Sequence, residues 1–277
     1  MISSIRLLKS IELPLVTAIL FFSCTFVSFA QAPEQTPTPT PLSSPAKQVQ
    51  IEDDPTKPIV FSLRNEHRFL KNDGWANTTI LRVDQLTLKN LGNKGGAKGL
   101  ILRFDIPFNT LRIGNTTKAG LGDIYAQALY IPKISRKFAL AVGSGIVLPT
   151  ATDDALGRGK VILSPTIVPV WYFSNRKRFA LVRIQNFFSV AGKSDKPDVN
   201  YFIAAPGIVH PLGRGWWVVG DTELKWDWKS KLGSGITGVQ LGRMLKGKFG
   251  IWIKPEVPWG PGRASEFNFK FTVFKVR

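Results

Sequence analysis

A strict alternation of charged and apolar residues constrains the fold of this chain more than any other feature of its sequence. In the stretch GWWVVGDTELKWDWK, residues 215–229, every second position from Asp221 is charged, and the positions between carry Thr, Leu and Trp. A helix would scatter these two sets around its circumference, whereas the period of two in a β-strand places them on opposite faces. The stretch therefore predicts a strand with one charged face and one apolar, aromatic face.

The same alternation recurs along most of the chain that follows residue 58. Clusters of Gly, Pro, Asn, Asp and basic residues divide it into segments of strand length. The expected strands are 59–66, 78–88, 99–107, 122–131, 137–148, 160–174, 177–190, 200–211, 215–229, 234–245, 248–257 and 265–276. No long helical pattern interrupts them, so the expected fold class is all-β.

Polar residues in the middle of these strands fit two architectures. In a secreted sandwich they would face water and the apolar face would form the core. In an outer-membrane barrel they would face the lumen, and aromatic residues near the strand ends would form interfacial girdles. Short links after the fourth, sixth, eighth and tenth strands alternate with longer links after the third, fifth, seventh and eleventh, which is typical of such barrels. The link after the ninth strand is shorter than this rule predicts, and the link after the second is longer. We therefore expect a transmembrane, antiparallel, up-and-down β-barrel of about 12 strands over residues 59–277.

This expected barrel assigns a role to each face of its strands. The polar residues predicted to line the lumen and the solute path are Arg82, Asp84, Arg103, Asp105, Arg183, Gln185, Asp221, Glu223, Lys225, Asp227, Lys254, Glu256, Glu266 and Lys270. The aromatic residues predicted to lie at the lipid interface are Trp171, Phe173, Trp216, Trp226 and Trp228. Both signs of charge occur close together in the first set, so counting alone leaves the charge selectivity open.

The N-terminal segment has the pattern of an exported protein. Residues 1–30 carry Arg6 and Lys9 before a long apolar run that ends in small residues, which predicts a signal peptide; an uncleaved membrane anchor is the alternative. Residues 31–58 begin with a Pro- and Thr-rich run and are expected to form a disordered spacer, with cell-wall contact as an open role. An even number of strands then places both termini of the barrel in the periplasm of a Gram-negative-type bacterium.

The charge and the scarcity of cysteine narrow the possible partners. The formal net charge is +18, which in a soluble protein suggests nucleic acid. The export signal and the barrel pattern instead favour outer-membrane lipids, a small-molecule solute and the barrel-assembly machinery as partners, with no nucleic acid. A secreted basic domain that binds DNA is kept as an alternative. The one cysteine lies within residues 1–30, so no disulfide framework is expected.

One region resembles a known family. The segments GLGDIYAQALY (120–130) and ALAVGSGIVLPTATDDALGRGKVILSPTIVPVWYF (139–173) carry a Gly-Asp strand opening, a Leu-Pro-Thr exit and a Gly-x-Gly-Lys entry. They resemble the outer-membrane family associated with the meta-pathway of phenol degradation, within the broad class of fatty-acid and aromatic-compound transporters. The resemblance implies a barrel of this size that passes small, often hydrophobic or aromatic solutes, and it brings no catalytic residues.

Enzymatic chemistry is not expected. The chain has only two histidines, and neither His67 nor His210 lies in a motif with a serine and an orienting acid. The adjacent pair Asp153 and Asp154 supplies too few oxygens for calcium, so we expect no metal, no cofactor and no catalytic residue. Two functions stay open: an outer-membrane channel or transporter with a polar, charged lumen, and a non-transporting tether or binding barrel that uses the spacer and the basic turns.

Overall fold

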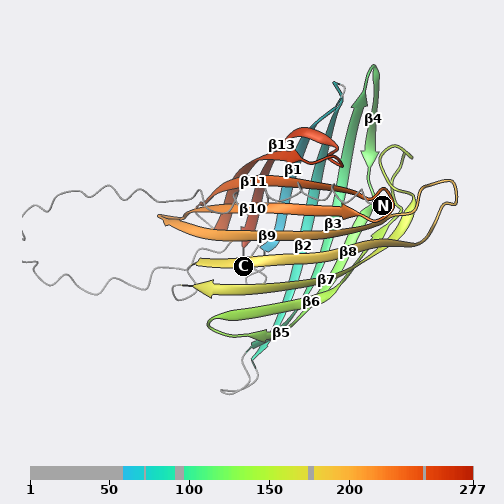
Figure 1. Ribbon diagram of the computed structural model, residues 1–277. Coiled ribbons are helices and arrows are strands. Elements are labelled where there is room, and N and C mark those ends of the chain that lie inside the picture. The colour runs from blue at the N-terminus through green and yellow to red at the C-terminus, as the bar shows by residue number, and fades with distance from the viewer. Residues whose placement is uncertain (1–58, 72, 91–96, 174–177, 246–247, 277) are drawn as a thin grey trace, which may run out of the picture. The chain divides into compact units, whose positions relative to one another are not determined.

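The computed structural model describes residues 59–71, 73–90, 97–173, 178–245 and 248–276 (Figure 1). The predicted signal peptide, 1–30, and the predicted spacer, 31–58, lie outside the described residues. No described segment forms a helix that is long and apolar enough to cross a membrane.

The described part of the chain is built from β-strands that follow one another along the sequence. They are β1 (Ile59–Leu70), β2 (Trp75–Asn90), β3 (Ala97–Ile113), β4 (Thr116–Leu121), β5 (Ile124–Ile134), β6 (Phe138–Leu148), β7 (Lys160–Phe173), β8 (Arg178–Gly192), β9 (Asn200–Gly213), β10 (Trp216–Asp227), β11 (Leu232–Met244), β12 (Phe249–Trp259) and β13 (Ser265–Val276). Each expected strand has a counterpart in this series, and β1, β2 and β3 run several residues longer than expected.

The sheet closes on itself. The strands pair antiparallel with their neighbours in sequence order, except that β5 pairs with β3 and not with β4. β1 pairs with both β2 and β13, and β2 also pairs with β3. Twelve of the thirteen strands form this ring, and β4 pairs only with the outer part of β3. The expected 12-stranded, antiparallel, up-and-down barrel is confirmed, and closure leaves its strands without a free edge.

The barrel has two distinct ends. We call the end where β1 begins and β13 ends the terminal end, and the opposite end the loop end. Described links at the terminal end are short, such as 135–137 and 214–215, whereas links at the loop end range from the short 228–231 to the longer 149–159 and 193–199. The two longest described links therefore lie at the loop end.

The hairpin of β3 and β4 was not expected from the sequence. Residues 108–113 continue β3 beyond the point where β5 leaves it, and they pair with 116–121 across a two-residue turn, Gly114-Asn115. Gly114 has φ +57°, a conformation that glycine adopts without strain. The hairpin projects away from the ring at the loop end (Figure 1), so it lacks the apolar alternation that marks the barrel strands.

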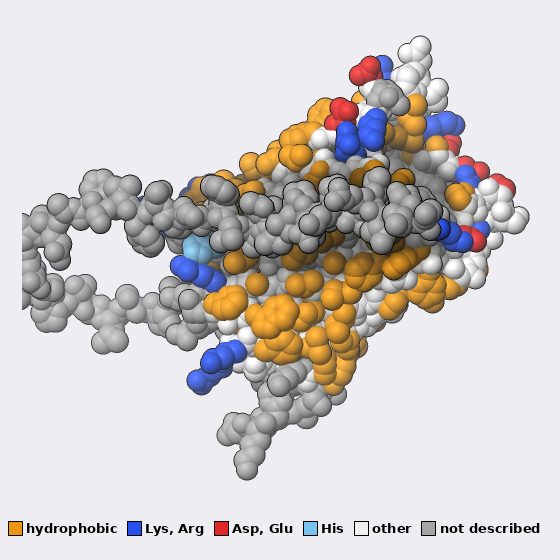
Figure 2. All heavy atoms as spheres, in the orientation of Figure 1, with side chains coloured by type: hydrophobic (Ala, Val, Ile, Leu, Met, Phe, Trp, Pro, Cys, Tyr) orange, Lys and Arg blue, Asp and Glu red, His pale blue; other side chains and the backbone are white. Residues whose placement is uncertain are grey.

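The outer wall of the barrel is apolar. Large hydrophobic side chains such as Leu63, Phe104, Ile208 and Val257 are 49, 49, 56 and 58% exposed, respectively. They alternate with interior residues along each strand, and Figure 2 shows them as a broad apolar band around the visible face. Such a band exceeds by far the apolar patches of soluble monomers and matches the lipid-facing surface of a membrane barrel.

Apolar side chains also fill the interior near the terminal end. We call Ile131, Val170, Phe179, Trp217 and Phe274 the apolar floor; all five are buried and belong to one packed cluster. The rings of Trp217 and Phe274 meet edge to face with their centres 6.0 Å apart. Glycine makes room for both rings, because a Cβ on Gly242 would lie 2.2 Å from Trp217 and one on Gly250 would lie 2.2 Å from Phe274.

Candidate functional site

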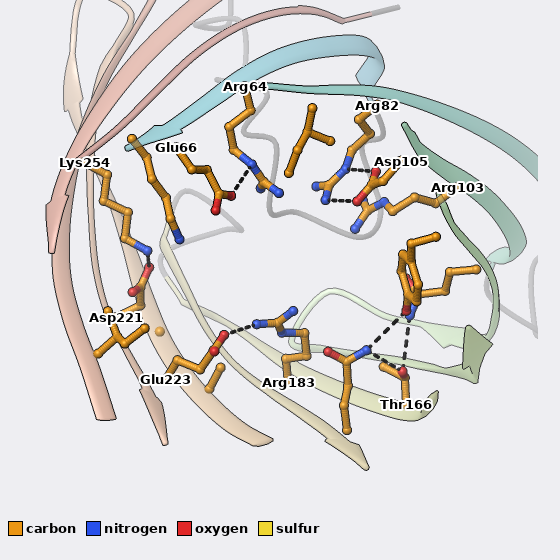
Figure 3. Close-up of a pocket in the computed structure, with 18 of the residues that line it drawn as sticks. Arg64, Glu66, Arg82, Arg103, Asp105, Thr166, Arg183, Asp221, Glu223 and Lys254 are labelled. Atoms are coloured by element: carbon orange, nitrogen blue, oxygen red, sulfur yellow. Dashed lines mark hydrogen bonds and ion pairs between the residues drawn. The ribbon is translucent and has the colours of Figure 1, made fainter. Parts of the chain in front are cut away.

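A polar cavity of about 620 Å³ lies inside the barrel between the apolar floor and the loop end. Its lining includes seven basic residues, Arg64, Arg68, Arg82, Arg103, Arg183, Lys254 and Lys270, and seven acidic residues, Glu66, Asp84, Asp105, Asp123, Asp221, Glu223 and Glu256. Figure 3 shows many of these side chains pointing inward from strands on different sides of the barrel. The formal charges of the lining therefore cancel.

Two crossed ion pairs join β2 to β3. Arg82 faces Asp105 and Asp84 faces Arg103 in the strand register, so each strand supplies one cation and one anion. Arg82 donates from Nε and Nη2 to the two oxygens of Asp105, both at 2.7 Å. Arg103 makes the same paired contact with Asp84, at 2.9 and 2.8 Å. These bidentate contacts fix the planar guanidinium groups against the wall.

A second charged network joins β10, β12 and β13. The Lys254 Nζ lies 2.7 Å from a carboxylate oxygen of Asp221 and 3.0 Å from one of Glu256. Glu256 also receives Lys270 at 2.9 Å and is only 2% exposed. A buried carboxylate held by two ammonium groups remains ionised, because each partner compensates for the loss of hydration.

Further polar contacts lie on other strands of the ring. Arg183 on β8 donates to Glu223 on β10 at 2.8 Å, and Arg64 pairs with Glu66, both on β1, at 2.8 Å. Gln185 on β8 donates from Nε2 to the hydroxyl of Thr166 on β7 at 2.9 Å. Polar side chains therefore line the cavity around much of its circumference, as a water-filled passage requires.

Most of the predicted lumen residues line this cavity. They are Arg82, Asp84, Arg103, Asp105, Arg183, Gln185, Asp221, Glu223, Lys254, Glu256 and Lys270. Lys225, Asp227 and Glu266 do not line it. The Lys225 Nζ lies 4.3 Å from the centre of the Tyr201 ring, Asp227 accepts hydrogen bonds from the backbone N–H groups of Lys229 and Ser230, and Glu266 is exposed near the loop end.

The predicted interface aromatics lie on the outer wall in two groups. Trp171, Phe173 and Trp216 are near the terminal end and are 42, 49 and 36% exposed. Trp226 and Trp228 are near the loop end, 41 and 53% exposed, with their ring centres 6.3 Å apart. Trp228 lies just beyond the last residue of β10, and its Nε1 donates to Asn186 at 3.3 Å.

Several residues that line the cavity were not predicted from the sequence. Arg64, Glu66 and Arg68 alternate with outward-facing residues on β1, so the period of two was available to find them. Tyr125 and Gln127 on β5 also line the cavity and were not predicted. The Tyr125 hydroxyl lies 3.0 Å from the hydroxyl of Ser164, which extends the polar lining to β7.

A link at the loop end folds against the entrance of the barrel. Residues 149–159 contribute Leu156, which is buried and accepts a hydrogen bond at its carbonyl from Asn109 at 2.8 Å. This link lines a second cavity of about 520 Å³, which shares Pro107, Asp123 and Val147 with the first. The two cavities therefore adjoin, and the link narrows the approach from the loop end.

Ion pairs hold that link in place. Asp153 accepts hydrogen bonds from the Ala155 backbone N–H and from Lys118, both at 2.9 Å, and these contacts lower the pKa of Asp153. Asp154 accepts from Lys193 at 2.7 Å, and the charges of Lys193 and Lys196 lower the pKa of Asp154 as well. Both aspartates therefore stay ionised below the pH at which free aspartate would protonate.

Among the described residues, no cluster of three or more His, Cys, Asp or Glu side chains could hold a metal ion.

No family model and no curated protein matches this sequence. Solved structures do match its fold. The COG4313 outer membrane channel from Pseudomonas putida F1 is 11% identical with a TM-score of 0.63, covering 85% of this chain and 100% of that one. The NanC porin is 13% identical with a TM-score of 0.55, covering 78% and 98%. The KdgM porin is 10% identical with a TM-score of 0.53, covering 77% and 98%. At these identities the likeness concerns the fold, which is that of outer-membrane β-barrel channels.

Proposed function

We propose that this protein is an outer-membrane channel whose solute path runs through the charged cavity. The observation that carries the proposal is the cavity itself, about 620 Å³ inside a closed barrel and lined by equal numbers of acidic and basic residues. A soluble sandwich would pack its interior with apolar side chains, whereas this barrel keeps its mid-strand interior polar. The likeness to outer-membrane channels and porins supports the same role.

The lining also supports a class of solute. Phe187 and Tyr201 stack face to face inside the barrel, with ring centres 4.8 Å apart, and Lys225 lies over the Tyr201 ring. These rings stand close to the paired charges of Arg183 and Glu223. A small aromatic solute that carries both signs of charge, such as an amino-acid zwitterion, would find stacking and ionic partners here. Apolar solutes of fatty-acid size fit less well, because charged side chains from most of the strands project into the cavity.

A second candidate, a sealed barrel that tethers or binds other envelope components, has one observation in its favour. The apolar floor occupies the interior at the terminal end, where Trp217 and Phe274 are 0% exposed. Under the channel proposal this floor is the narrowest point of the path and gates it by excluding water. Under the second candidate it is a permanent closure.

The proposal also includes the location and orientation of the barrel in the membrane. The fold and the apolar outer wall support residence in the outer membrane, with Trp171, Phe173, Trp216, Trp226 and Trp228 at its interfaces. We infer that the terminal end faces the periplasm, because it carries short links together with the start of β1 and the end of β13. We also infer cleavage after residue 30, delivery by the barrel-assembly machinery, and a spacer over 31–58 that can reach the cell wall.

The experiment is a flux assay with two solutes that differ by one ring. Proteoliposomes are loaded with radiolabelled phenylalanine or alanine, and efflux is timed for the wild type, for Tyr201→Ala and for the outer-wall control Leu224→Ala. We expect efflux of both solutes, with phenylalanine slowed by Tyr201→Ala and unaffected by Leu224→Ala. Efflux no faster than from loaded liposomes without protein would favour the sealed barrel.

A further inference from the structure

The terminal end of the barrel is basic and carries no acidic residue among those that the structure describes. Its exposed cations lie in links or at strand ends, and they are Arg136, Lys137, Arg178, Arg214, Arg243 and Lys248, with Lys275 partly buried beside them. We call these seven residues the basic rim. The described Asp and Glu residues lie in the cavity or toward the loop end, and Figure 2 shows Lys and Arg without acidic neighbours at the terminal end of the visible face.

The loop end has a different arrangement of charge. There several lysines of the described links and strand ends lie close to carboxylates: Lys118 is 2.9 Å from Asp153, Lys193 is 2.7 Å from Asp154, and Lys160 is 3.1 Å from Asp198. No ion pair of this kind is found for the basic rim within the described ranges. Like charges gathered at one end of the barrel repel one another, and an anionic partner would relieve that repulsion.

Two members of the basic rim are held against aromatic rings of the outer wall. The Arg243 guanidinium lies 5.0 Å from the centre of the Trp216 ring, and the Lys275 ammonium lies 5.6 Å from that of Phe249. In both cases the cation and the ring are cross-strand neighbours, as the pairing of β10 with β11 and of β12 with β13 requires. Tryptophan and phenylalanine at this height mark the boundary between acyl chains and head groups, so these cations stand at the level of lipid phosphates.

We propose that the basic rim is a binding surface for anionic phospholipid head groups of the leaflet that meets the terminal end. Rim residues occur from the link between β5 and β6 round to β13, which is most of the circumference of the barrel, and the cation–aromatic pairs of the rim lie on the outer wall. Each basic group near an anionic leaflet adds to the attraction between the leaflet and the protein. The rim thereby fixes the depth and the orientation of the barrel in an asymmetric membrane, and this role does not depend on whether the lumen conducts.

The test compares two variants with the same change in charge. Arg136→Gln/Lys137→Gln/Arg178→Gln neutralises part of the basic rim, and Lys118→Gln/Lys193→Gln/Lys229→Gln neutralises three loop-end lysines. Each folded, detergent-purified protein is titrated with acyl-labelled phosphatidylglycerol and with acyl-labelled phosphatidylcholine at low ionic strength. We expect the wild type to prefer phosphatidylglycerol, the rim variant to bind it more than tenfold more weakly, and the loop-end variant to stay within about twofold of the wild type.

Three results would overturn the proposal. Equal affinity for the two lipids would remove the preference for an anionic head group. Equal losses in the two variants would show diffuse attraction rather than a surface at one end. Equal competition by soluble glycerol phosphate or by cell-wall fragments would identify another ligand. Because a triple variant can fail to fold, Arg243→Gln/Lys275→Gln serves as a second rim variant, and a heat-modifiability gel establishes that every protein compared is a folded barrel.

Discussion

Arg103 and Asp84 face each other across β3 and β2, and the guanidinium donates to both carboxylate oxygens, at 2.9 and 2.8 Å. The Asp84 side chain is nearly inaccessible, with an exposed fraction of 2%, whereas the Arg103 side chain is 22% exposed. The register alone brings this pair together, because each residue lies directly opposite the other on the interior face.

Removing one partner of this pair should destabilise the barrel more than removing both. Asp84→Asn leaves the Arg103 charge without its carboxylate, and we expect a loss of about 2 kcal/mol in the free energy of unfolding. The double variant Asp84→Asn/Arg103→Gln should recover more than half of that loss, because no unpaired charge remains. Urea unfolding in lipid vesicles, followed by tryptophan fluorescence, measures both. A double variant whose loss equals or exceeds the single variant's loss would contradict this account.

Removing acidic residues from the lumen and removing basic residues from it should shift the ion selectivity in opposite directions. The wild-type lining balances seven basic and seven acidic residues, so we expect weak selectivity between potassium and chloride. Asp221→Asn/Glu223→Gln leaves an excess of positive charge and should favour chloride, whereas Arg183→Gln/Lys254→Gln should favour potassium. Reversal potentials in a salt gradient measure the preference. Two variants that shift the potential in the same direction would show that these groups do not line the path.

Gly242 should be intolerant of even one added methyl group. A Cβ at this position would lie 2.2 Å from the Trp217 ring, so Gly242→Ala should displace that ring and cost about 1–3 kcal/mol of stability. The matched control is Gly220→Ala on the neighbouring strand, where the nearest atom, in Ile208, is 4.0 Å away. Near-ultraviolet circular dichroism and urea unfolding should separate the two variants, and equal effects would contradict the packing of the apolar floor.

The loop-end link should loosen in acid. The Lys193 contact lowers the pKa of Asp154, so the ion pair stabilises the folded link above the ordinary aspartate pKa of 3.8 and is lost as the pH falls through the lowered value. Hydrogen exchange of 149–159, corrected for intrinsic rates, should show constant protection at neutral pH and a decline below about pH 4. Asp154→Asn should reduce the protection at neutral pH and flatten the decline. If the pH dependence of protection in Asp154→Asn equals that of the wild type, contacts other than the Asp154–Lys193 ion pair protect the link.

The strands and their faces could be predicted because a membrane barrel has two solvents. Lipid outside and water inside impose a period of two on each strand, and Asp221 and Trp226 follow it as plainly as any pair in the chain. Arg64 and Glu66 follow the same rule, but they lie among Asn65 and His67, whose outward polarity conceals the alternation. The β3–β4 hairpin stands outside the ring, so neither solvent imposed a pattern on it.

The interior could be predicted only in part. Sequence identifies charged residues as interior, but the partner of each charge depends on strand register. Lys254 was predicted to line the lumen, yet its contact with Asp221 depends on how β10 and β12 align across β11. The apolar floor was missed because Trp217 and Phe274 continue the polar face of their strands, where apolar residues were expected only outside.

The measurement that tests the central claim most directly is single-channel recording in planar bilayers, with the wild type and Trp217→Ala/Phe274→Ala compared side by side. If the path runs through the charged cavity and narrows at the apolar floor, the wild type gives small, discrete conductance steps and the double variant gives clearly larger ones. A heat-modifiability gel establishes that both are folded. Bilayers that stay silent with both proteins would contradict the channel and leave the barrel as a sealed structure.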